Sequence, residues 1–513
     1  MPKLPPPPGR SGGSRPQPPN PCVSPPYPSR PASHRPGQSG GKLPPEPPPQ
    51  YGHAKSDGKL VVAAIDFGTT YSGWAFSFKH DFERDPCKVS AQTWTGNQLL
   101  SLKGQTCVLI KPDGKTLEKF GYDAETYYSQ LSQRGEHKKW YYFQKFKMML
   151  SNKPIHKDMM LDDESGKSLP AITVFSLSIR FMIDDLTSMS NQQVSGLNLE
   201  DIYWVLTVPA IWDDSAKQFM RLAAQEAGIP CEKLSIALEP EAASIYCRHA
   251  PVKVDATAGG ISSFKSGSKY LVLDAGGGTI DITVHEVCFG GKLKELFKAT
   301  GGAWGGTMVD KAFLDFLADL IGKDVLQRFK DDHMEDFLDL LRDFEIKKRA
   351  TNSSSEGLVT IKLPLVLIEL VDECKGLSMT KIVQSSRYAN KVTLASDKFR
   401  LDFNIFRSFF TESINAIVHH MKTLLREGEP SKAGAILMVG GYSESPLLAE
   451  TMREKFPRLE IIVPTDAGLA VLKGAVIFGH LPTSITERVS KYTYGTDGIP
   501  VPSFFVAVRI MAF

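Results

Sequence analysis

The chain carries the sequence DAGGGTID at residues 274–281 and a related stretch, DFGTT, at residues 66–70. Each stretch follows a run rich in β-branched residues and precedes a second strand-like run. This pattern predicts two β-hairpins, each with an aspartate at its mouth and with glycine and threonine in its turn. Glycines let backbone N–H groups approach a phosphate closely, and threonine hydroxyls add further donors. Two such hairpins facing each other would hold a nucleotide triphosphate from both sides.

The acidic residues of the hairpins are suited to one kind of metal site. Mg²⁺ keeps several water ligands and binds few carboxylates, so aspartates at these positions are placed to hold it through its water shell. The seven cysteines are scattered and none lies in a CxxC pair, which argues against a zinc site.

Composition indicates a folded protein with a distinct N-terminal segment. The chain has 513 residues, of which 42% are hydrophobic, and a net charge of +3; it is long enough for more than one domain. Residues 1–58 contain seven Lys or Arg and two Asp or Glu, which leaves 53 basic and 55 acidic residues elsewhere. The near-neutral remainder argues against a nucleic-acid-binding face.

Targeting signals are not readable in the sequence. No apolar stretch approaches the ~18 residues that a membrane span needs. The N-terminus lacks the apolar core of a signal peptide. We therefore expect a soluble protein of the cytoplasm or the nucleus.

The N-terminal segment is rich in proline, with 19 of the 35 prolines in residues 1–50. It cannot bury enough apolar surface to offset its chain entropy, so residues 1–58 are expected to be a disordered tail with polyproline II bias. PPQY at residues 48–51 fits a ligand of WW domains, and several PxxP spacings fit SH3 domains. Such matches also arise by chance in a proline-rich segment, so the tail as a docking site and the tail as a plain extension both stay open.

Beyond the tail, strand and helix patterns alternate twice. The expected elements are a helix at 172–186, a strand at 202–208, helices at 215–227, 308–322 and 334–351, a β-like region to about 395, a helix at 404–427, a strand at 435–439 and a helix at 466–479. With hairpins 208 residues apart, this order predicts two α/β lobes of common plan around a ligand cleft. The predicted divisions are a tail at 1–58, lobe I at 59–250, a Gly/Ser/Ala-rich linker at 251–268, lobe II at 269–480 and a short C-terminal remnant at 481–513.

Taken together, the motifs resemble those of the 70-kDa heat-shock protein family, within the actin-like ATPase superfamily. They are IDFGTTYS at 65–72, TVPA at 207–210, EPEAA at 239–243, DAGGGTID at 274–281, EIKKR at 345–349 and VGG at 439–441. They occur in the family's order across residues 60–480. The surrounding sequence, such as WYYF at 140–143 and VPAIW at 208–212, is most similar to the divergent branch called heat-shock 70-kDa protein 12. The resemblance implies a two-lobed actin-like ATPase fold, with duplicated βββαβαβα-type lobes around a nucleotide cleft.

The resemblance also implies roles for individual residues, with ATP or ADP and Mg²⁺ as cofactors. Asp66, Asp274 and Asp281 would hold the hydrated metal. Catalytic roles would fall to Lys145, Glu239, Asp274 and Thr279, with Lys147 as the alternative to Lys145. Nucleotide would be bound by Gly68, Thr69, Thr70, Tyr71, Gly276, Gly277, Gly278, Thr279, Glu345, Lys348, Arg349, Gly440 and Gly441. The alternative interpretations, without a functional role, are a solvated lysine at position 145 and a charged helix face at 345–349.

The sequence departs from the family's pattern in two places. Glu444 stands where the family usually has an arginine that stacks on the adenine, and a glutamate cannot stack in that way. The family also places a β-sandwich peptide-binding domain after the nucleotide domain, whereas only 34 residues follow Gly479 here. A complete peptide-binding domain is therefore not expected in this chain.

Three functions follow as hypotheses. The first is an ATP-binding nucleotide switch with slow Mg²⁺-dependent ATP hydrolysis, related to chaperones. The second is a non-catalytic nucleotide-binding adaptor that recruits protein partners through its lobes and its proline-rich tail. The third is a small-molecule kinase of the same superfamily, which the EPEAA segment argues against.

Overall fold

The structure is a computed structural model that describes residues 58–492, except 97–98, 152–154, 157, 194–197 and 251–264. All described residues belong to one compact unit of the chain. The tail predicted at 1–58, its WW and SH3 ligand motifs, most of the linker predicted at 251–268 and most of the remnant predicted at 481–513 lie outside the described residues.

The first predicted hairpin is present and forms the centre of a mixed sheet. Strand β1 (Val61–Phe67) pairs antiparallel with β2 (Tyr71–Phe78) and parallel with β12 (Ile202–Val208), which pairs parallel with β13 (Leu234–Leu238). The sheet order is β13-β12-β1-β2-β3, and β6 also pairs with β2. The outer strands are β3 (Ser90–Ala91) and β6 (Gly104–Gln105). Strand β1 is buried along its whole length, and its first five residues, 61–65, form a continuous apolar run before Asp66.

The second hairpin repeats this plan in a second sheet. Strand β14 (Lys269–Ala275) pairs antiparallel with β15 (Ile280–Val287) and parallel with β20 (Ala435–Val439). The sheet order is β21-β20-β14-β15-β16-β22. The remaining strands are β16 (Leu293–Gly302), β21 (Glu460–Ile462) and β22 (Ile485–Glu487). The duplicated hairpin with its parallel neighbours is the two-lobed α/β plan predicted from the sequence.

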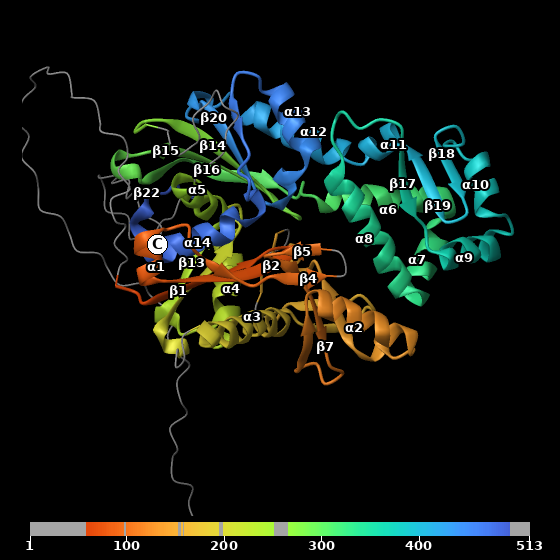
Figure 1. The fold of residues 1–513 in the computed structure, drawn as a ribbon, viewed down its shortest axis with the longest axis horizontal. Coiled ribbons are helices and arrows are strands. Elements are labelled where there is room, and N and C mark those ends of the chain that lie inside the picture. The colour runs from red at the N-terminus through yellow and green to blue at the C-terminus, as the bar shows by residue number, and fades with distance from the viewer. Residues whose placement is uncertain are drawn as a thin grey trace, which may run out of the picture. The chain divides into compact units, whose positions relative to one another are not determined.

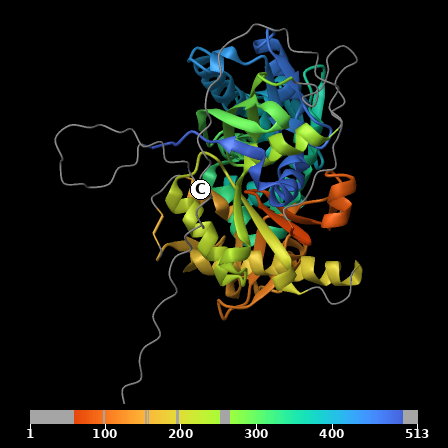
Figure 2. The ribbon, with the colours of Figure 1, turned by 90° about the vertical axis from the view of Figure 1, so that its left-hand side faces the viewer.

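Two helices pack between the sheets, and each contacts the sheet of the other lobe as well as its own part of the chain. Helix α5 (Glu239–His249) follows β13 of the first sheet but also packs on β14, β15 and β20 of the second. Helix α14 (Ala470–His480) ends the second lobe but packs on β1, β2 and β12 of the first. In both views α14 lies between the two sheets (Figure 1, Figure 2). One apolar core therefore joins both sheets through α5 and α14.

The other helices and small sheets surround the two main sheets. The longer helices are α2 (Tyr122–Gln133), α3 (Ala171–Gln193), α4 (Asp214–Glu226), α6 (Thr307–Ile321), α7 (Lys323–Asp332), α8 (Met334–Ala350), α9 (Leu365–Lys375), α12 (Thr411–Leu424) and α13 (Pro446–Lys455). The short helices are α1 (Lys79–Arg84), α10 (Met379–Ser385) and α11 (Phe403–Ser408). The small sheets contain β7 (Cys107–Ile110), β8 (Leu117–Phe120) and β9 (Tyr141–Gln144); β17 (Leu358–Lys362), β18 (Val392–Ala395) and β19 (Lys398–Asp402); β4 (Trp94–Gly96) and β5 (Leu99–Ser101); and β10 (Met160–Asp162) and β11 (Ser168–Pro170). None of the helices in the described part of the chain is long and apolar enough to cross a membrane.

Two predicted segments differ from the structure. The helix predicted at 404–427 is divided into α11 and α12, which are separated at residues 409–410. The β-like region predicted before 395 contains helices α9 and α10 as well as strands. In α9, Leu367, Leu370 and Val371 are buried at helical spacing, a periodicity that the apolar run LVLIELV conceals.

Two histidines are buried in the core that joins the sheets. His285 lies on β15, and His480 ends α14, where it shares a hydrogen bond of 2.9 Å with the Ser77 hydroxyl. The His480 ring stacks on Phe82 at 4.2 Å between centroids. Burial lowers the pKa of each histidine to about 4. Both are therefore neutral in the folded protein at any pH above that value.

We expect these histidines to make the fold sensitive to mild acid. As the pH falls below about 6.5, the unfolded chain binds protons that the folded chain excludes until about pH 4, so the free energy of unfolding decreases. Each histidine contributes up to about 1.4 kcal/mol per pH unit in this window. Urea unfolding at several pH values measures the free energy of unfolding, which should depend less steeply on pH in His480→Asn than in the wild type, by about one proton. The exposed His419→Asn is the control; equal slopes for wild type and His480→Asn would contradict a neutral buried His480.

Candidate functional site

The turns of the two hairpins lie against each other. A Cβ atom at Gly277 would lie 2.2 Å from the Thr70 hydroxyl, and one at Gly278 would lie 2.7 Å from the Thr69 hydroxyl. Side chains at these two glycines would therefore separate the hairpins. The close approach places the threonine hydroxyls of one turn beside the backbone of the other.

The hairpin turns form part of the wall of a cavity of ≈ 1050 Å³. Most of the predicted site residues line it: Asp66, Gly68, Thr69, Thr70, Tyr71, Lys145, Glu239, Asp274, Gly276, Gly277, Gly278, Thr279, Glu345, Lys348, Arg349, Gly440 and Gly441. Lys147 lines the cavity as well, whereas Asp281 lies behind its wall. Asp281 accepts a hydrogen bond of 2.9 Å from the backbone N–H of Ile211, which follows the TVPA segment.

Buried carboxylates gather at the inner end of the cavity. Asp66 accepts hydrogen bonds from the Thr207 hydroxyl at 2.9 Å and from the Lys103 ammonium at 2.5 Å. Burial raises the pKa of Asp66, but the charge and hydrogen bond of Lys103, the charge of Lys147 and the hydrogen bond of Thr207 together outweigh burial, and the net result is a lowered pKa. Asp66 is therefore ionised throughout the physiological range.

For the other three carboxylates, burial outweighs the contacts that favour ionisation. Burial, and then the charges of Glu239, Asp281 and Asp66, hold the pKa of Asp274 well above its usual range. Burial raises the pKa of Glu239 to about 7 and that of Asp281 to about 6. Crowded carboxylates in a dry pocket are stabilised by a bound cation.

The residues fit the water-mediated metal site predicted from the sequence. Oδ2 of Asp274 is buried and has no hydrogen-bond partner among the described residues. No group of three or more His, Cys, Asp or Glu side chains in the described part of the chain is arranged to hold a metal ion directly. An ion held through its own water ligands satisfies both observations.

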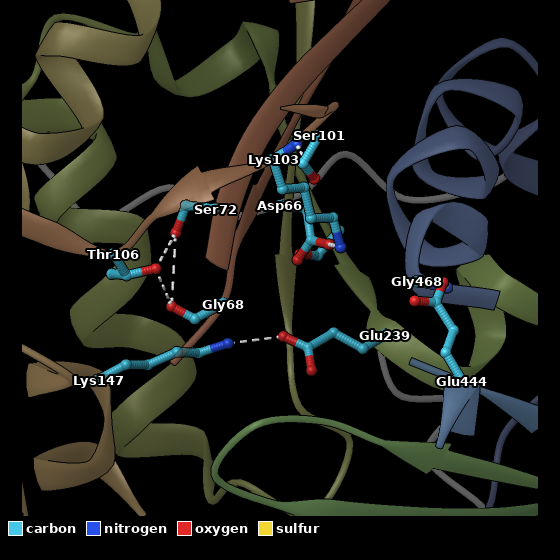
Figure 3. Close-up of polar contacts among 11 residues, drawn as sticks. Asp66, Gly68, Ser72, Ser101, Lys103, Thr106, Lys147, Glu239, Glu444 and Gly468 are labelled. Atoms are coloured by element: carbon cyan, nitrogen blue, oxygen red, sulfur yellow. Dashed lines mark hydrogen bonds and ion pairs between the residues drawn. The ribbon is translucent and has the colours of Figure 1, made fainter. Parts of the chain in front are cut away.

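The structure separates the two candidate lysines. Lys147 is 3% exposed, and its ammonium lies 2.7 Å from Glu239 Oε1 (Figure 3). The same ammonium lies 5.1 Å from the centre of the Trp212 ring. Lys145 is 41% exposed and points to Asp310 at 3.3 Å. Lys145 has a left-handed backbone, φ 53°, before a short 3₁₀ turn at Phe146–Leu150. The geometry thus brings Lys147, the alternative, among the carboxylates and leaves Lys145, the first choice, at the side of the cavity.

Helix α8 provides a polar wall on the far side of the cavity. Lys348 is buried and pairs at 2.5 Å with both Asp310 and Glu345. Arg349 pairs with Glu345 at 2.7 Å, and its guanidinium lies 5.0 Å from the centre of the Tyr71 ring. These side chains therefore line the cavity beside the first hairpin.

The turn after β20 completes the cavity rim. Gly440 has φ 84°, and a Cβ atom there would lie 2.4 Å from a carboxylate oxygen of Asp274, so the position requires glycine. Glu444 is exposed, and its Oε1 accepts a hydrogen bond of 2.9 Å from the Gly468 N–H (Figure 3). Glu444 thus binds the neighbouring loop, and it also lines the cavity.

Sequence reasoning missed several charged residues of the cavity, among them Lys103 and Asp310. Lys103 follows β5 in a region without a recognisable motif, so no pattern could have assigned it. Asp310 lies in the first turn of α6, where an acidic residue is common for reasons of helix stability alone.

Comparison with known proteins agrees with this geometry. The family model described as "Hsp70 protein" matches residues 156–490. The chain belongs to the Hsp70 family. It is 35% identical to mouse heat shock 70 kDa protein 12A over 488 residues, which cover 85% of this chain and 72% of the relative. It is 34% identical to human heat shock 70 kDa protein 12B, with 92% and 76% covered.

More distant Hsp70 relatives match a smaller part. The chaperone protein DnaK of Cenarchaeum symbiosum is 26% identical over 307 residues, which cover 57% of this chain and 40% of the relative. The family resemblance predicted from the motifs is therefore confirmed, and the fold is the actin-like ATPase fold of the Hsp70 family. Members of that family bind ATP or ADP with Mg²⁺.

Proposed function

We propose that this chain is an ATP-binding nucleotide switch that hydrolyses ATP slowly in the presence of Mg²⁺. The observation that carries the proposal is a group of four carboxylates between two Gly/Thr hairpins, with Lys147 among them; three are buried and Glu239 is 13% exposed. The four are Asp66, Glu239, Asp274 and Asp281. Phosphoryl transfer depends mainly on positioning and charge neutralisation, and this arrangement offers both.

In this proposal the metal is held through water by Asp66, Asp274 and Asp281, and when bound it neutralises charge on the phosphoryl oxygens. The hydroxyls of Thr69, Thr70 and Thr279 donate to phosphate, together with the backbone N–H groups of Gly68 and of residues 276–278. Lys147 and Glu239 orient the attacking water. The adenosine side is formed by Glu345, Lys348, Arg349, Gly440 and Gly441.

The alternative is a non-catalytic adaptor, in which nucleotide stabilises the fold and protein partners bind the lobes and the tail. One observation favours it: Glu444 binds the Gly468 loop at the position where the family's stacking arginine would stand. Weak binding of the base would then limit turnover.

Calorimetric titration with Mg²⁺-ATP and Mg²⁺-ADP, followed by phosphate release on the same sample, tests the proposal. We expect binding of both nucleotides with slow release of phosphate. Binding without release would favour the adaptor. No binding of either nucleotide would contradict both.

Replacing Lys147 should have a larger effect than replacing Lys145. Lys147→Met removes a buried ammonium beside Glu239, and we expect phosphate release to fall about tenfold or more. Lys145→Met removes a half-exposed charge and should cause a smaller loss. Single-turnover phosphate release measures both, with thermal melting as the control for folding. The reverse order would return the catalytic role to Lys145.

A further inference from the structure

A second lysine enters the carboxylate group from a different direction. Lys103 lies between β5 and β6, and its ammonium is 2.5 Å from Asp66 Oδ2. The side chains of Lys103 and Asp66 are 14% and 5% exposed. Figure 3 shows Lys103 reaching Asp66 while Lys147 reaches Glu239 from another side. The proposed hydrolysis gives Lys103 no role.

The first hairpin is shaped to admit this lysine. Gly73 pairs directly with Asp66 across the β1–β2 hairpin. A Cβ atom at Gly73 would lie 3.1 Å from Lys103 Cγ and 2.8 Å from the Leu102 carbonyl oxygen. The absence of a side chain at Gly73 therefore leaves room for the lysine stem to cross β2 and reach Asp66.

The backbone of Lys103 is also held in place. Its N–H donates to the Ser101 hydroxyl at 3.1 Å. Three residues further on, the Thr106 hydroxyl donates to the carbonyl oxygen of Gly68 in the phosphate turn at 2.8 Å. The segment that carries Lys103 is thus fixed to the hairpin on the side that follows Lys103, where β6 also pairs with β2, and its ammonium is directed at one carboxylate.

Charge balance indicates what this ammonium does. The four carboxylates Asp66, Glu239, Asp274 and Asp281 outnumber the ammonium groups of Lys103 and Lys147, so this group has no excess of positive charge without nucleotide. A triphosphate or diphosphate adds further negative charge, which is unfavourable in a buried site unless cations are already present. The Lys103 ammonium acts directly on one of the proposed metal-holding residues, Asp66, at 2.5 Å.

We propose that the Lys103 ammonium is a built-in cation of the nucleotide site. It pairs with Asp66 in the absence of metal, and it lets the chain bind a nucleoside diphosphate or triphosphate without a divalent ion. Bound metal and the Lys103 ammonium compete for Asp66. When the metal displaces the ammonium from Asp66, the ammonium can turn to the phosphates. This inference rests on the proposed nucleotide binding.

Calorimetric titration with ADP and with ATP, each in excess chelator and in excess Mg²⁺, tests the inference. In the wild type we expect the two conditions to differ in affinity by no more than about tenfold. Lys103→Met should weaken metal-free binding by about tenfold to a hundredfold, the range for a hydrogen bond to a charged group. It should leave binding with Mg²⁺ nearly unchanged, because Asp66 is then free for the metal.

Three further variants separate charge from structure. Lys103→Arg keeps the charge and should retain metal-free binding. Gly73→Ala keeps the lysine but obstructs its stem, so it should weaken metal-free binding as Lys103→Met does. Lys115→Met removes a lysine outside the cavity and is the control for net charge. Thermal melting of each variant checks that it folds.

The outcomes distinguish the two proposals. If the nucleotide affinities of Lys103→Met and of the wild type change equally on removal of Mg²⁺, while both proteins bind Mg²⁺-ATP, the role proposed for Lys103 is wrong and the proposed function stands. If Lys103→Arg loses metal-free binding as fully as Lys103→Met, the charge argument is wrong. If the wild type binds no nucleotide in either condition, the proposed function fails, and the inference with it.

Discussion

Asp274→Asn is expected to lower ATP turnover by about a hundredfold to a thousandfold. Asp274 lies at the mouth of the second hairpin, and its unpartnered Oδ2 is buried against the cavity. Asparagine has the same shape but no charge, so the fold is retained while one of the groups proposed to hold the hydrated metal is lost. Phosphate release under saturating Mg²⁺-ATP measures the effect. Unchanged turnover would remove Asp274 from the metal site.

The same substitution should keep or raise the stability of the nucleotide-free protein. Because the pKa of Asp274 is raised well above its usual value, the folded chain retains a proton that the unfolded chain releases. The free energy of unfolding therefore falls as the pH rises above about 4, and asparagine removes this dependence. Thermal melting between about pH 5 and about pH 8 should show the gain, whereas the exposed Asp315→Asn should show none. If Asp274→Asn is clearly less stable than the wild type, burial and the neighbouring carboxylates do not disfavour the ionised form of Asp274.

The elements predicted best from the sequence were those with local signals. The two hairpins follow from strand runs on either side of Gly/Thr turns, and β12 and β20 from short buried apolar runs. A helix was predicted at 404–427, but its division into α11 and α12 was missed because no proline or glycine marks the break, which falls at two phenylalanines. Helix α9 was missed because an apolar run does not reveal its period.

The site could be predicted only as far as its motifs extend. The hairpin residues line the cavity because their turns are fixed by the same glycines and threonines that form the motif. The choice between Lys145 and Lys147 depends on a left-handed residue and a 3₁₀ turn, which a lysine-rich sequence does not specify. Lys103 reaches Asp66 only because the chain folds back over Gly73, a contact between residues 30 positions apart.

Gly474→Ala is expected to destabilise the protein by more than about 3 kcal/mol. In an exposed helix this change is favourable by about 1 kcal/mol, since alanine is the better helix former. Here α14 crosses α5 at Gly474, and a Cβ atom would lie 1.7 Å from the Ala242 carbonyl oxygen. That oxygen belongs to the backbone and cannot rotate away, so the two helices must separate. The steric cost therefore exceeds the gain in helix propensity and reverses its sign.

The separation should also reach the nucleotide site, because α5 begins at Glu239, which pairs with Lys147. We therefore expect Gly474→Ala to lower both the thermal midpoint and the affinity for Mg²⁺-ATP, measured by melting and by calorimetry. Gly428→Ala is the matched control, because Gly428 is exposed with no atom within 4 Å of the added Cβ, and it should leave both quantities unchanged. A wild-type midpoint for Gly474→Ala would show that the helices can move apart at little cost. The core that joins the two sheets would then be too compliant to couple nucleotide binding to the relative position of the lobes.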